Sequence, residues 1–476
     1  MHTIHKLSFR IVQFTLAALL VFCAAALPTA AKAEEQKPNF IIIFTDDQGY
    51  QDLGCFGSED ITTPHIDRMA NEGRMLTSFY SANPVCSASR AALMTGCYPR
   101  RVLETKTVLF PRDNVGLHPG ETTIADMLGA NGYTTACVGK WHLGHHPEFL
   151  PTAQGFDSYF GIPYSNDMCH PADAKRARYG KWDEYWSRPE DSGMWQTPLI
   201  EGENIIEHPV DQRTITRRYT DRAISFIQEN KQQPFFLYLA HSMPHVPLYL
   251  PDELYNADPK RAYISVIEHI DAEVGRILDT LRGEGLDENT YVIFTSDNGP
   301  WLRFNHHAGK AGPLNGGKGS TFEGGMRVPC IIWAPGRIPA DSKSDGIAST
   351  IDLLPTIAAI AGITPETKGP IDGLNLADFL HDRSPSPRSE FLYYTSKVQC
   401  IRQGDWKLRQ QDKTTQLFNL AEDIGERKNL TSRHPEKVAS LKKRMHALDQ
   451  QIIADARPLG KLVTSEPTGE NPGATP

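Results

Sequence analysis

Charged and polar side chains follow four separate apolar runs of the sequence, each typical of a β-strand. In chain order they are Asp46 and Asp47, Lys140 and His142, His241, and Asp297 and Asn298. Ligands bind to open α/β sheets at the carboxyl ends of the strands, so we expect these side chains to meet at one edge of a sheet. Three carboxylates placed together repel one another unless a cation lies between them. Carboxylate and amide oxygens suit Ca²⁺ or Mg²⁺, so the sequence predicts a site for a hard divalent cation.

Each acidic motif taken alone is also typical of a turn. Asp, Asn and Gly favour turns after strands for local reasons, and residues 46–49 (DDQG) and 296–299 (SDNG) fit that description. Both motifs occur here together with Lys and His at two further strand ends. This combination favours a shared site over unrelated turns.

A second candidate for chemistry is Cys86 in the segment of residues 84–96 (PVCSASRAALMTG). Small polar residues precede a helix-forming run, so Cys86 is expected near a helix N-terminus, where backbone N–H groups favour anions. Arg90 would lie one turn further along the same face. A nucleophile, a guanidinium and a helix N-terminus together describe an oxyanion site. The alternative is that Cys86 is a buried or disulfide-bonded cysteine.

These candidates lie on an alternation of apolar runs and helical stretches, which favours an α/β domain with a largely parallel sheet. Predicted strands are residues 39–45, 134–139, 234–240, 291–296 and 328–333. Predicted helices are residues 122–130, 214–230, 261–282 and 351–361.

The composition changes near residue 383, where residues 382–389 (DRSPSPRS) are polar and rich in proline. We therefore place a catalytic domain at residues 34–385 and a small α+β subdomain at residues 386–456. Within the subdomain we expect short strands at residues 391–395, 400–401, 406–409 and 416–420, and a helix at residues 435–453. Residues 457–476 lack periodicity and are predicted to be a flexible tail.

Charge and the N-terminal segment limit the partners and the location of the protein. The chain has 49 Lys and Arg against 57 Asp and Glu, a formal net charge of −8, and no basic stripe, which argues against nucleic acid. Residues 1–33 combine early cations, an apolar run and the cleavage pattern Ala31-Lys32-Ala33, as in a signal peptide. The apolar run is short for a membrane span and no later apolar run is long enough to span a bilayer, so we predict an exported protein without stable membrane insertion.

Seven cysteines follow residue 33, and none forms a CxxC pair, so a structural zinc site is not expected. An odd number in an exported protein suggests one thiol with a separate role, and the other six allow 15 pairings. The sequence carries no signal for an oligomeric state.

The segment of residues 86–90 (CSASR), followed by AALMTG, resembles the formylglycine signature of the type I sulfatases. Further motifs of that family follow in order: DDQG at residues 46–49, GKWHLG at 139–144, HSMPH at 241–245, TSDNGP at 295–300 and GKGSTFEGG at 317–325. The resemblance covers residues 38–450, and residues 161–165 (GIPYS) are similar to arylsulfatase A and N-acetylgalactosamine-6-sulfatase. It implies an alkaline-phosphatase-like fold, in which helices sandwich a large mixed sheet and a small antiparallel sheet with a helix follows.

The resemblance also implies a mechanism. A maturation enzyme would oxidise Cys86 to formylglycine. The metal would be Ca²⁺, with Mg²⁺ as the less favoured choice, and its ligands would be Asp46, Asp47, residue 86, Asp297 and Asn298. One hydroxyl of the hydrated formylglycine would attack sulfur and form a covalent sulfo-enzyme. The reaction would be hydrolysis of an alcohol or aryl sulfate ester to inorganic sulfate, with a sulfated carbohydrate favoured as substrate.

Roles for the remaining motif residues follow from the same resemblance. Lys318 and His241 would contact the sulfate and help to protonate the leaving oxygen. Arg90 and Lys140 would hold the hydrate, and His142 would take a proton from its second hydroxyl. Ser165 matches a sulfate contact. No role is assigned to His145, His146, His245, His306 and His307, which are expected on the surface or in the substrate pocket.

Two alternative functions stay open at this point. Ala88 stands where the commonest signature has proline, so conversion of Cys86 depends on the maturation system of the host. A phosphomonoester or phosphonate hydrolase of the same superfamily would be expected to show ligands for two zinc ions, and only one set is visible. A non-catalytic binder of sulfated glycans would be expected to lack Cys86 or a metal ligand, and none is missing.

Side chains that could stack on the substrate are Trp182, Trp186, Trp195, Trp301 and His307.

Overall fold

The computed structural model describes residues 36–168 and 195–462. From Pro38 onward these residues belong to one compact unit. The predicted signal peptide, Cys169, Trp182 and Trp186 lie outside the described residues.

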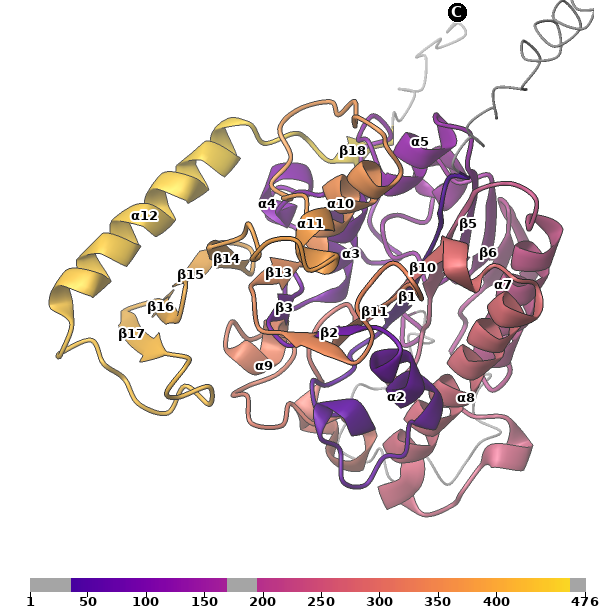
Figure 1. Ribbon diagram of the computed structural model, residues 1–476, viewed down its shortest axis with the longest axis horizontal. Coiled ribbons are helices and arrows are strands. Elements are labelled where there is room, and N and C mark those ends of the chain that lie inside the picture. The colour runs from indigo at the N-terminus through magenta and orange to yellow at the C-terminus, as the bar shows by residue number, and fades with distance from the viewer. Residues whose placement is uncertain (1–35, 169–194, 463–476) are drawn as a thin grey trace, which may run out of the picture. The chain divides into compact units, whose positions relative to one another are not determined.

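A mixed sheet of ten strands forms the centre of the fold (Figure 1). In spatial order the strands are β12 (Ser342–Ser344), β2 (Arg74–Leu76), β11 (Cys330–Trp333), β10 (Thr290–Ser296), β1 (Asn39–Thr45), β9 (Phe235–Ala240), β5 (Thr134–Gly139), β6 (Ser158–Gly161), β7 (Leu199–Glu201) and β8 (Asn204–Glu207). The five strands from β10 to β6 run parallel, whereas β11 and β7 join antiparallel on either side. The five strands predicted from the sequence are all present within one or two residues of their expected bounds.

Helices cover both faces of this sheet because its central strands are apolar on both faces. In β1 the side chains of Ile41 and Ile43 pack on one face, and those of Phe40, Ile42 and Phe44 on the other. The first face carries α2 (Pro64–Asn71), α7 (Ile215–Glu229) and α8 (Ala262–Gly283). The second face carries α3 (Cys86–Thr95), α5 (Ile124–Gly129), α10 (Leu353–Ile360) and α11 (Ala377–Leu380). Continuous apolar runs are typical of strands buried in this way.

Short elements complete the region up to residue 385, which was predicted as the catalytic domain and is called the catalytic part below. The predicted helix at residues 351–361 begins as the 3-10 turn η10 (Thr350–Asp352) and continues as α10. The other short helices and strands are α4 (Pro99–Val102), α9 (Glu323–Met326), β3 (Phe79–Tyr80), β4 (Val115–Gly116) and β13 (Ala348–Ser349). Further 3-10 turns are η1 (Gly54–Phe56), η2 (Pro147–Phe149), η3 (Pro151–Ala153), η6 (Asp252–Leu254), η7 (Pro259–Arg261), η8 (Asp287–Asn289) and η9 (Leu302–His307).

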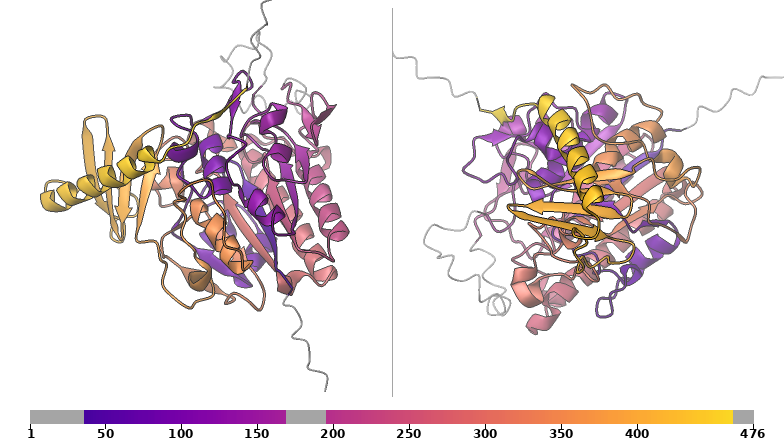
Figure 2. Two further views of the ribbon diagram at one scale, coloured as in Figure 1. Left: turned by 90° about the horizontal axis from the view of Figure 1, so that it is seen from above. Right: turned by 90° about the vertical axis from the view of Figure 1, so that its left-hand side faces the viewer.

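The C-terminal region is an antiparallel meander with one long helix, as predicted (Figure 2). Its elements are β14 (Glu390–Tyr394), β15 (Val398–Gln403), β16 (Trp406–Gln411), β17 (Thr414–Asn419) and α12 (Pro435–Ala454). The helix buries Leu441, Met445 and Ile452 against the sheet. The same apolar cluster includes Tyr80 and Met326 of the catalytic part, so the two regions share a core.

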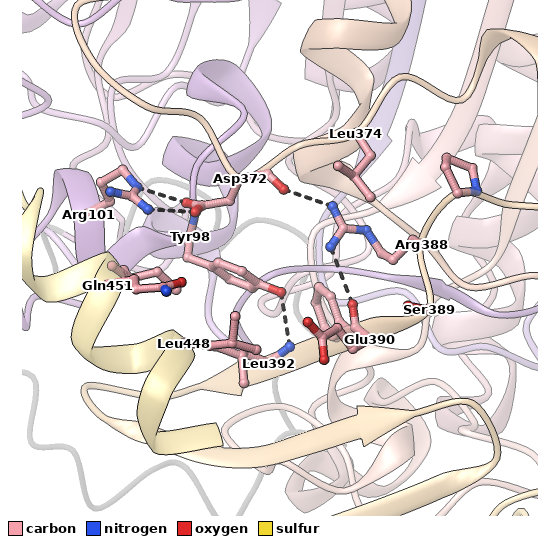
Figure 3. Close-up of a pocket in the computed structure, with 13 residues that line it drawn as sticks. Tyr98, Arg101, Asp372, Leu374, Arg388, Ser389, Glu390, Leu392, Leu448 and Gln451 are labelled. Carbon is pink, nitrogen blue, oxygen red and sulfur yellow. Dashed lines mark hydrogen bonds and ion pairs between the residues drawn. The ribbon is translucent and has the colours of Figure 1, made fainter. Parts of the chain in front are cut away.

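A cavity of about 260 Å³ lies where the catalytic part meets β14 and α12 (Figure 3). The charged groups in its wall are paired: Arg101 with Asp372 at 2.7 Å, and Arg388 with Asp352. Tyr98 Oη accepts a hydrogen bond of 2.9 Å from the backbone N–H of Leu392 in β14. These bonds fasten the C-terminal sheet to the catalytic part.

The start of the C-terminal tail differs from the prediction. A flexible tail was predicted from residue 457 onward, but Arg457 pairs with Glu121 at 2.8 Å and β18 (Gly460–Lys461) pairs with β4. Such a short tertiary contact leaves no periodic pattern in the sequence.

The six described cysteines (Cys55, Cys86, Cys97, Cys137, Cys330 and Cys400) are free thiols, so no disulfide joins any two of them. In the described ranges, no helix has both the length and the apolar character needed to cross a bilayer.

Candidate active site

Four neighbouring strands bring most of the predicted site residues to one edge of the large sheet. These strands lie in the order β10-β1-β9-β5 and run parallel, so their carboxyl ends meet. Helix α3 reaches the same edge with Cys86 as its first residue. Hydrogen bonds and short contacts join the cluster formed by Asp46, Asp47, Cys86, Arg90, Lys140, Ser165, Asp297, Asn298 and Lys318.

Three carboxylates and one amide form the acidic part of the site. The backbone N–H of Asp47 donates to Asp297 Oδ1 (3.1 Å), and Asn298 Nδ2 donates to Asp47 Oδ1 (2.7 Å). Asp46, Asp47, Asp297 and Asn298 are all buried. The amide oxygen of Asn298 is also buried, and no described group donates a hydrogen bond to it. Asp47 has a φ of 64°, a conformation that non-glycine residues seldom adopt outside functional sites and turns.

Three cationic side chains contact these carboxylates individually. Lys140 Nζ lies 2.5 Å from Asp46 Oδ2, and Lys318 Nζ lies 2.8 Å from Asp47 Oδ2. The guanidinium of Arg90 donates to Asp297 Oδ2 from Nε (3.1 Å) and Nη2 (2.9 Å), and also to the carbonyl oxygen of Lys140 (2.8 Å). Each carboxylate therefore has a fixed orientation before any ligand arrives.

The cations do not fully offset the cost of burying these carboxylates in their charged form. Burial raises the pKa of Asp297 to about 7, with repulsion from Asp46 adding to the effect and Arg90 opposing it. Burial also raises the pKa of Asp47, against the attraction of Lys318. Burial alone would raise the pKa of Asp46 too, but the cations Lys140 and Arg90 hold it well below its usual value.

The residues present fit a divalent cation bound by oxygen. Ligand atoms of Asp46, Asp47, Cys86 and His245 lie within 4.8 Å of one another. The unpartnered oxygen of Asn298 and the raised pKa values of Asp47 and Asp297 mark places where a cation would be stabilising.

Cys86 is poorly suited to act as a thiolate. Its Sγ lies 3.4 Å from Asp46 Oδ1 in a fully enclosed position. Burial raises the pKa of this thiol well above its usual value, and Asp297 and Asp46 raise it further. A reactive cysteine requires the opposite environment, in which positive charge lowers the thiol pKa.

Two buried histidines adjoin the cluster. His245 Nε2 lies 3.5 Å from Asp47 Oδ2, and its ring lies 3.4 Å from Ser165 Oγ. His142 Nε2 lies 3.0 Å from the carbonyl oxygen of Leu109, whereas Nδ1 is buried without a hydrogen-bond partner. Burial lowers the pKa of both rings well below the usual value, with Lys318 adding to the effect at His245 and Lys140 at His142. Both histidines are therefore neutral near pH 7.

The structure does not bring His241 to this cluster. His241 directly follows β9, and side chains of a strand alternate between faces. Its ring is buried without a described hydrogen-bond partner. Burial lowers its pKa to about 3, and the one titratable group that adds to this effect is His269 of α8, on the face that carries α2, α7 and α8. Of the two histidines in this motif the structure therefore brings His245 to the cluster, and not His241, which was expected there.

Trp301, one of the residues predicted to stack on a substrate, adjoins the cluster. The ammonium of Lys318 lies 4.3 Å from the centroid of the Trp301 ring, and the His245 ring lies 5.4 Å from it. Of the other residues predicted to stack on a substrate, Trp195 and His307 are buried.

Fold and site together define the class of the protein. An alkaline-phosphatase-like α/β fold with an acidic, cation-compatible cluster at its strand ends is that of a hydrolase of charged esters. The Sulfatase family model matches residues 38–363, and the chain belongs to this family. It is therefore a sulfuric ester hydrolase, as the motifs at residues 46–49 and 86–90 indicated.

Known relatives agree with this assignment. The chain is 38% identical over 403 residues to the N-acetylgalactosamine-6-sulfatase of Canis lupus familiaris, an alignment that covers 82% of this chain and 74% of the relative. It is 33% identical to the arylsulfatase G of Rattus norvegicus, over 91% of this chain and 90% of the relative. The crystal structure of Ps i-CgsB in complex with k-i-k-neocarrahexaose is similar with a TM-score of 0.76 and 31% identity, over 89% of this chain and 94% of that one.

Proposed function

We propose that the protein hydrolyses a sulfate ester of a carbohydrate with residue 86 as formylglycine. The observation that carries this proposal is the environment of Cys86, which begins α3 and whose thiol is held neutral by burial and two carboxylates. A thiol in this position has little use as a nucleophile. Oxidation to formylglycine by a maturation enzyme would replace the thiol with an aldehyde whose hydrate offers a hydroxyl nucleophile for sulfur.

The cation proposed for the site is Ca²⁺, held by oxygens of Asp46, Asp47, Asp297 and Asn298. Its chemical contribution, when bound, is to withdraw charge from the sulfuryl oxygens. Arg90 and Lys140 hold two of these carboxylates in place, through contacts of 2.9 Å to Asp297 and 2.5 Å to Asp46.

Proton movement is proposed for the two histidines at the cluster. The carbonyl oxygen of Leu109 is only an acceptor, so His142 carries its proton on Nε2 and keeps a lone pair on Nδ1. We propose that this lone pair accepts a proton from the hydrate at residue 86. Lys318 and His245 both contact Asp47 and adjoin Trp301, so we assign them to the sulfate and the leaving oxygen. Ser165, 3.3 Å from Lys140 Nζ, is proposed as a further sulfate contact.

Carbohydrate sulfate is the proposed substrate class because the relatives include an N-acetylgalactosamine-6-sulfatase and a structure in complex with a neocarrahexaose. The pattern of residues 1–33 supports export of the mature protein to the periplasm or the extracellular space.

The proposal is tested by mass spectrometry of the tryptic peptide of residues 75–90, together with sulfate release from an aryl sulfate. We expect an aldehyde at residue 86 and release that chelator abolishes and Ca²⁺ restores. A matched aryl phosphate controls for the phosphoesterase alternative. An intact thiol with no sulfate release would contradict the proposal, and faster turnover of the phosphate would favour the alternative.

Replacement of the two histidines of the HSMPH motif should separate their roles. We expect His245→Gln to lower kcat/KM for an aryl sulfate by about 10²- to 10³-fold, because the buried ring assigned to the sulfate and the leaving oxygen is lost. His241→Gln removes a ring that is buried outside the cluster, so we expect kcat/KM within a few-fold of the parent. Steady-state kinetics at pH 7 measures both. Equal losses in the two variants would contradict the assignment of His245.

A further inference from the structure

The turn between β14 and β15 touches the catalytic loops. Asn83 Nδ2 donates to the carbonyl oxygen of Thr395 in this turn (3.2 Å). Gln399 Nε2 donates to Thr395 Oγ1 (3.0 Å), and Thr321 Oγ1 donates to Gln399 Oε1 (2.9 Å). The turn of residues 395–397 is therefore fixed to the catalytic part through Thr395, its first residue, and through Gln399 in the strand that follows.

Both anchors of the turn belong to segments that carry site residues. Asn83 precedes Cys86 by three residues, and Thr321 follows Lys318 by three residues. The backbone N–H of Gly319 donates to the carbonyl oxygen of Pro84 (2.9 Å), which joins these two segments directly. The turn thus packs against the two joined loops that carry Cys86 and Lys318.

At the tip of this turn, Ser396 and Lys397 are exposed. Within residues 36–168 and 195–462 no hydrogen bond or ion pair is found for the Lys397 ammonium. Its charge contrasts with that of the surrounding protein. Residues 34–385 contain 31 Lys and Arg against 46 Asp and Glu, whereas residues 386–462 contain 15 against 9. The C-terminal region is therefore basic, whereas residues 34–385 are acidic, and Lys397 carries part of this positive charge on the turn that contacts the catalytic loops.

We propose that Lys397 binds a second anionic group of the substrate, a carboxylate or a further sulfate that is not hydrolysed. This inference rests on the proposed sulfatase function of the site. It assigns the substrate to glycans that carry at least two negative charges, in preference to singly charged sulfate esters. An ammonium acts as a point charge, so it accepts either anion, and Arg or Lys should be tolerated at this position.

The test compares kcat/KM of the full-length enzyme for three sulfated disaccharides. One has a single sulfate, one has a second sulfate, and one has a uronate beside the sulfate. For each doubly charged substrate we divide its kcat/KM by that of the singly charged substrate. We expect this ratio to fall about tenfold in Lys397→Glu. It should fall about threefold in Lys397→Gln, and raised salt should shrink the ratio of the parent enzyme. The doubly charged substrate whose ratio falls more in Lys397→Glu identifies the second anion as a sulfate or a carboxylate.

A matched control is available in the same sheet. Lys413 is exposed at the turn between β16 and β17, and no described residue forms an ion pair with it. Lys413→Glu makes the same charge change and is expected to leave the ratio as in the parent. The inference is overturned if the ratios in Lys397→Glu and Lys413→Glu agree, or if Lys397→Glu lowers kcat/KM equally for all three substrates. Failure of the parent enzyme to release sulfate from any substrate is a different result, because it refutes the proposed function and this inference with it.

Discussion

An Asp297→Asn variant is expected to lose at least about 10³-fold of kcat/KM for an aryl sulfate while it keeps its fold. The carboxylate of Asp297 has three tasks at once. It accepts two hydrogen bonds from Arg90 and one from the backbone N–H of Asp47, and it is a proposed ligand of the cation. An amide keeps the size of the side chain but loses the charge, so the cation is bound less tightly and Arg90 is held less firmly.

The same substitution should change how the protein responds to Ca²⁺ and to pH. Without a cation, burial and Asp46 raise the pKa of Asp297 to about 7, so its proton is retained in the folded protein where an unfolded chain would release it. Stability contributed in this way is complete at low pH and is lost as pH rises from about 4 to about 7. The cation-free parent should therefore lose more stability between pH 5 and pH 7.5 than the variant. Added Ca²⁺ should raise the melting temperature of the parent by linkage and have little effect on the variant.

A suitable control for this experiment is Asp271→Asn. Asp271 of α8 is also a buried carboxyl whose pKa burial raises, here to about 6, and it accepts a 2.7 Å hydrogen bond from the backbone N–H of Ile66. It contacts none of the site residues named above, so its variant should keep both the activity and the Ca²⁺ response. Activity and a Ca²⁺-dependent melting temperature that persist in Asp297→Asn would contradict the cation site.

The meeting of Asp46 and Asp297 at one edge of the sheet could be predicted because the signals for it are local. The strands β1 and β10 are continuous apolar runs, and their last residues lie directly before Asp46 and Asp297. Parallel pairing of the two strands in register then brings these residues together. To predict that Asp46 and Asp297 lie together, it was enough to locate the ends of these two strands in the sequence.

The misplaced histidine shows where such local reasoning stops. His241 directly follows β9, as Asp46 follows β1, and position alone favoured it over His245. Which of the two side chains reaches the cluster depends on the path of the backbone after the strand. The residues of that path carry no periodic pattern, and the partners of His245 are Ser165 and Asp47, which are distant in the sequence. The contacts of Thr395 with Asn83 are equally invisible in the sequence, because they span more than 300 residues.

A Lys407→Met variant is expected to lose about 3–5 kcal/mol of unfolding free energy, because it leaves buried carboxylates without their cation. Lys407 lies in β16 and is fully buried, with Nζ 2.9 Å from Glu323 Oε1 and 2.8 Å from Glu426 Oε1. Burial alone would raise the pKa of Glu323, but Lys407, followed by Arg327 and Arg402, holds it well below its usual value. Burial already raises the pKa of Glu426 despite the attraction of Lys407.

The loss of Lys407 should also be felt at the active site, because Glu323 begins α9 only five residues after Lys318. Glu323 accepts further hydrogen bonds from Tyr80 (2.6 Å) and Tyr393 (2.7 Å), so it joins the catalytic part to the C-terminal sheet. We expect urea unfolding to give a lower midpoint for Lys407→Met, and the double variant with Glu323→Gln to recover part of the loss because one uncompensated charge is gone. Lys413→Met, which removes an exposed lysine from the same sheet, should change stability by less than about 0.5 kcal/mol. Equal midpoints for the two lysine variants would show that the buried charges relax without cost, contrary to the role assigned to this network.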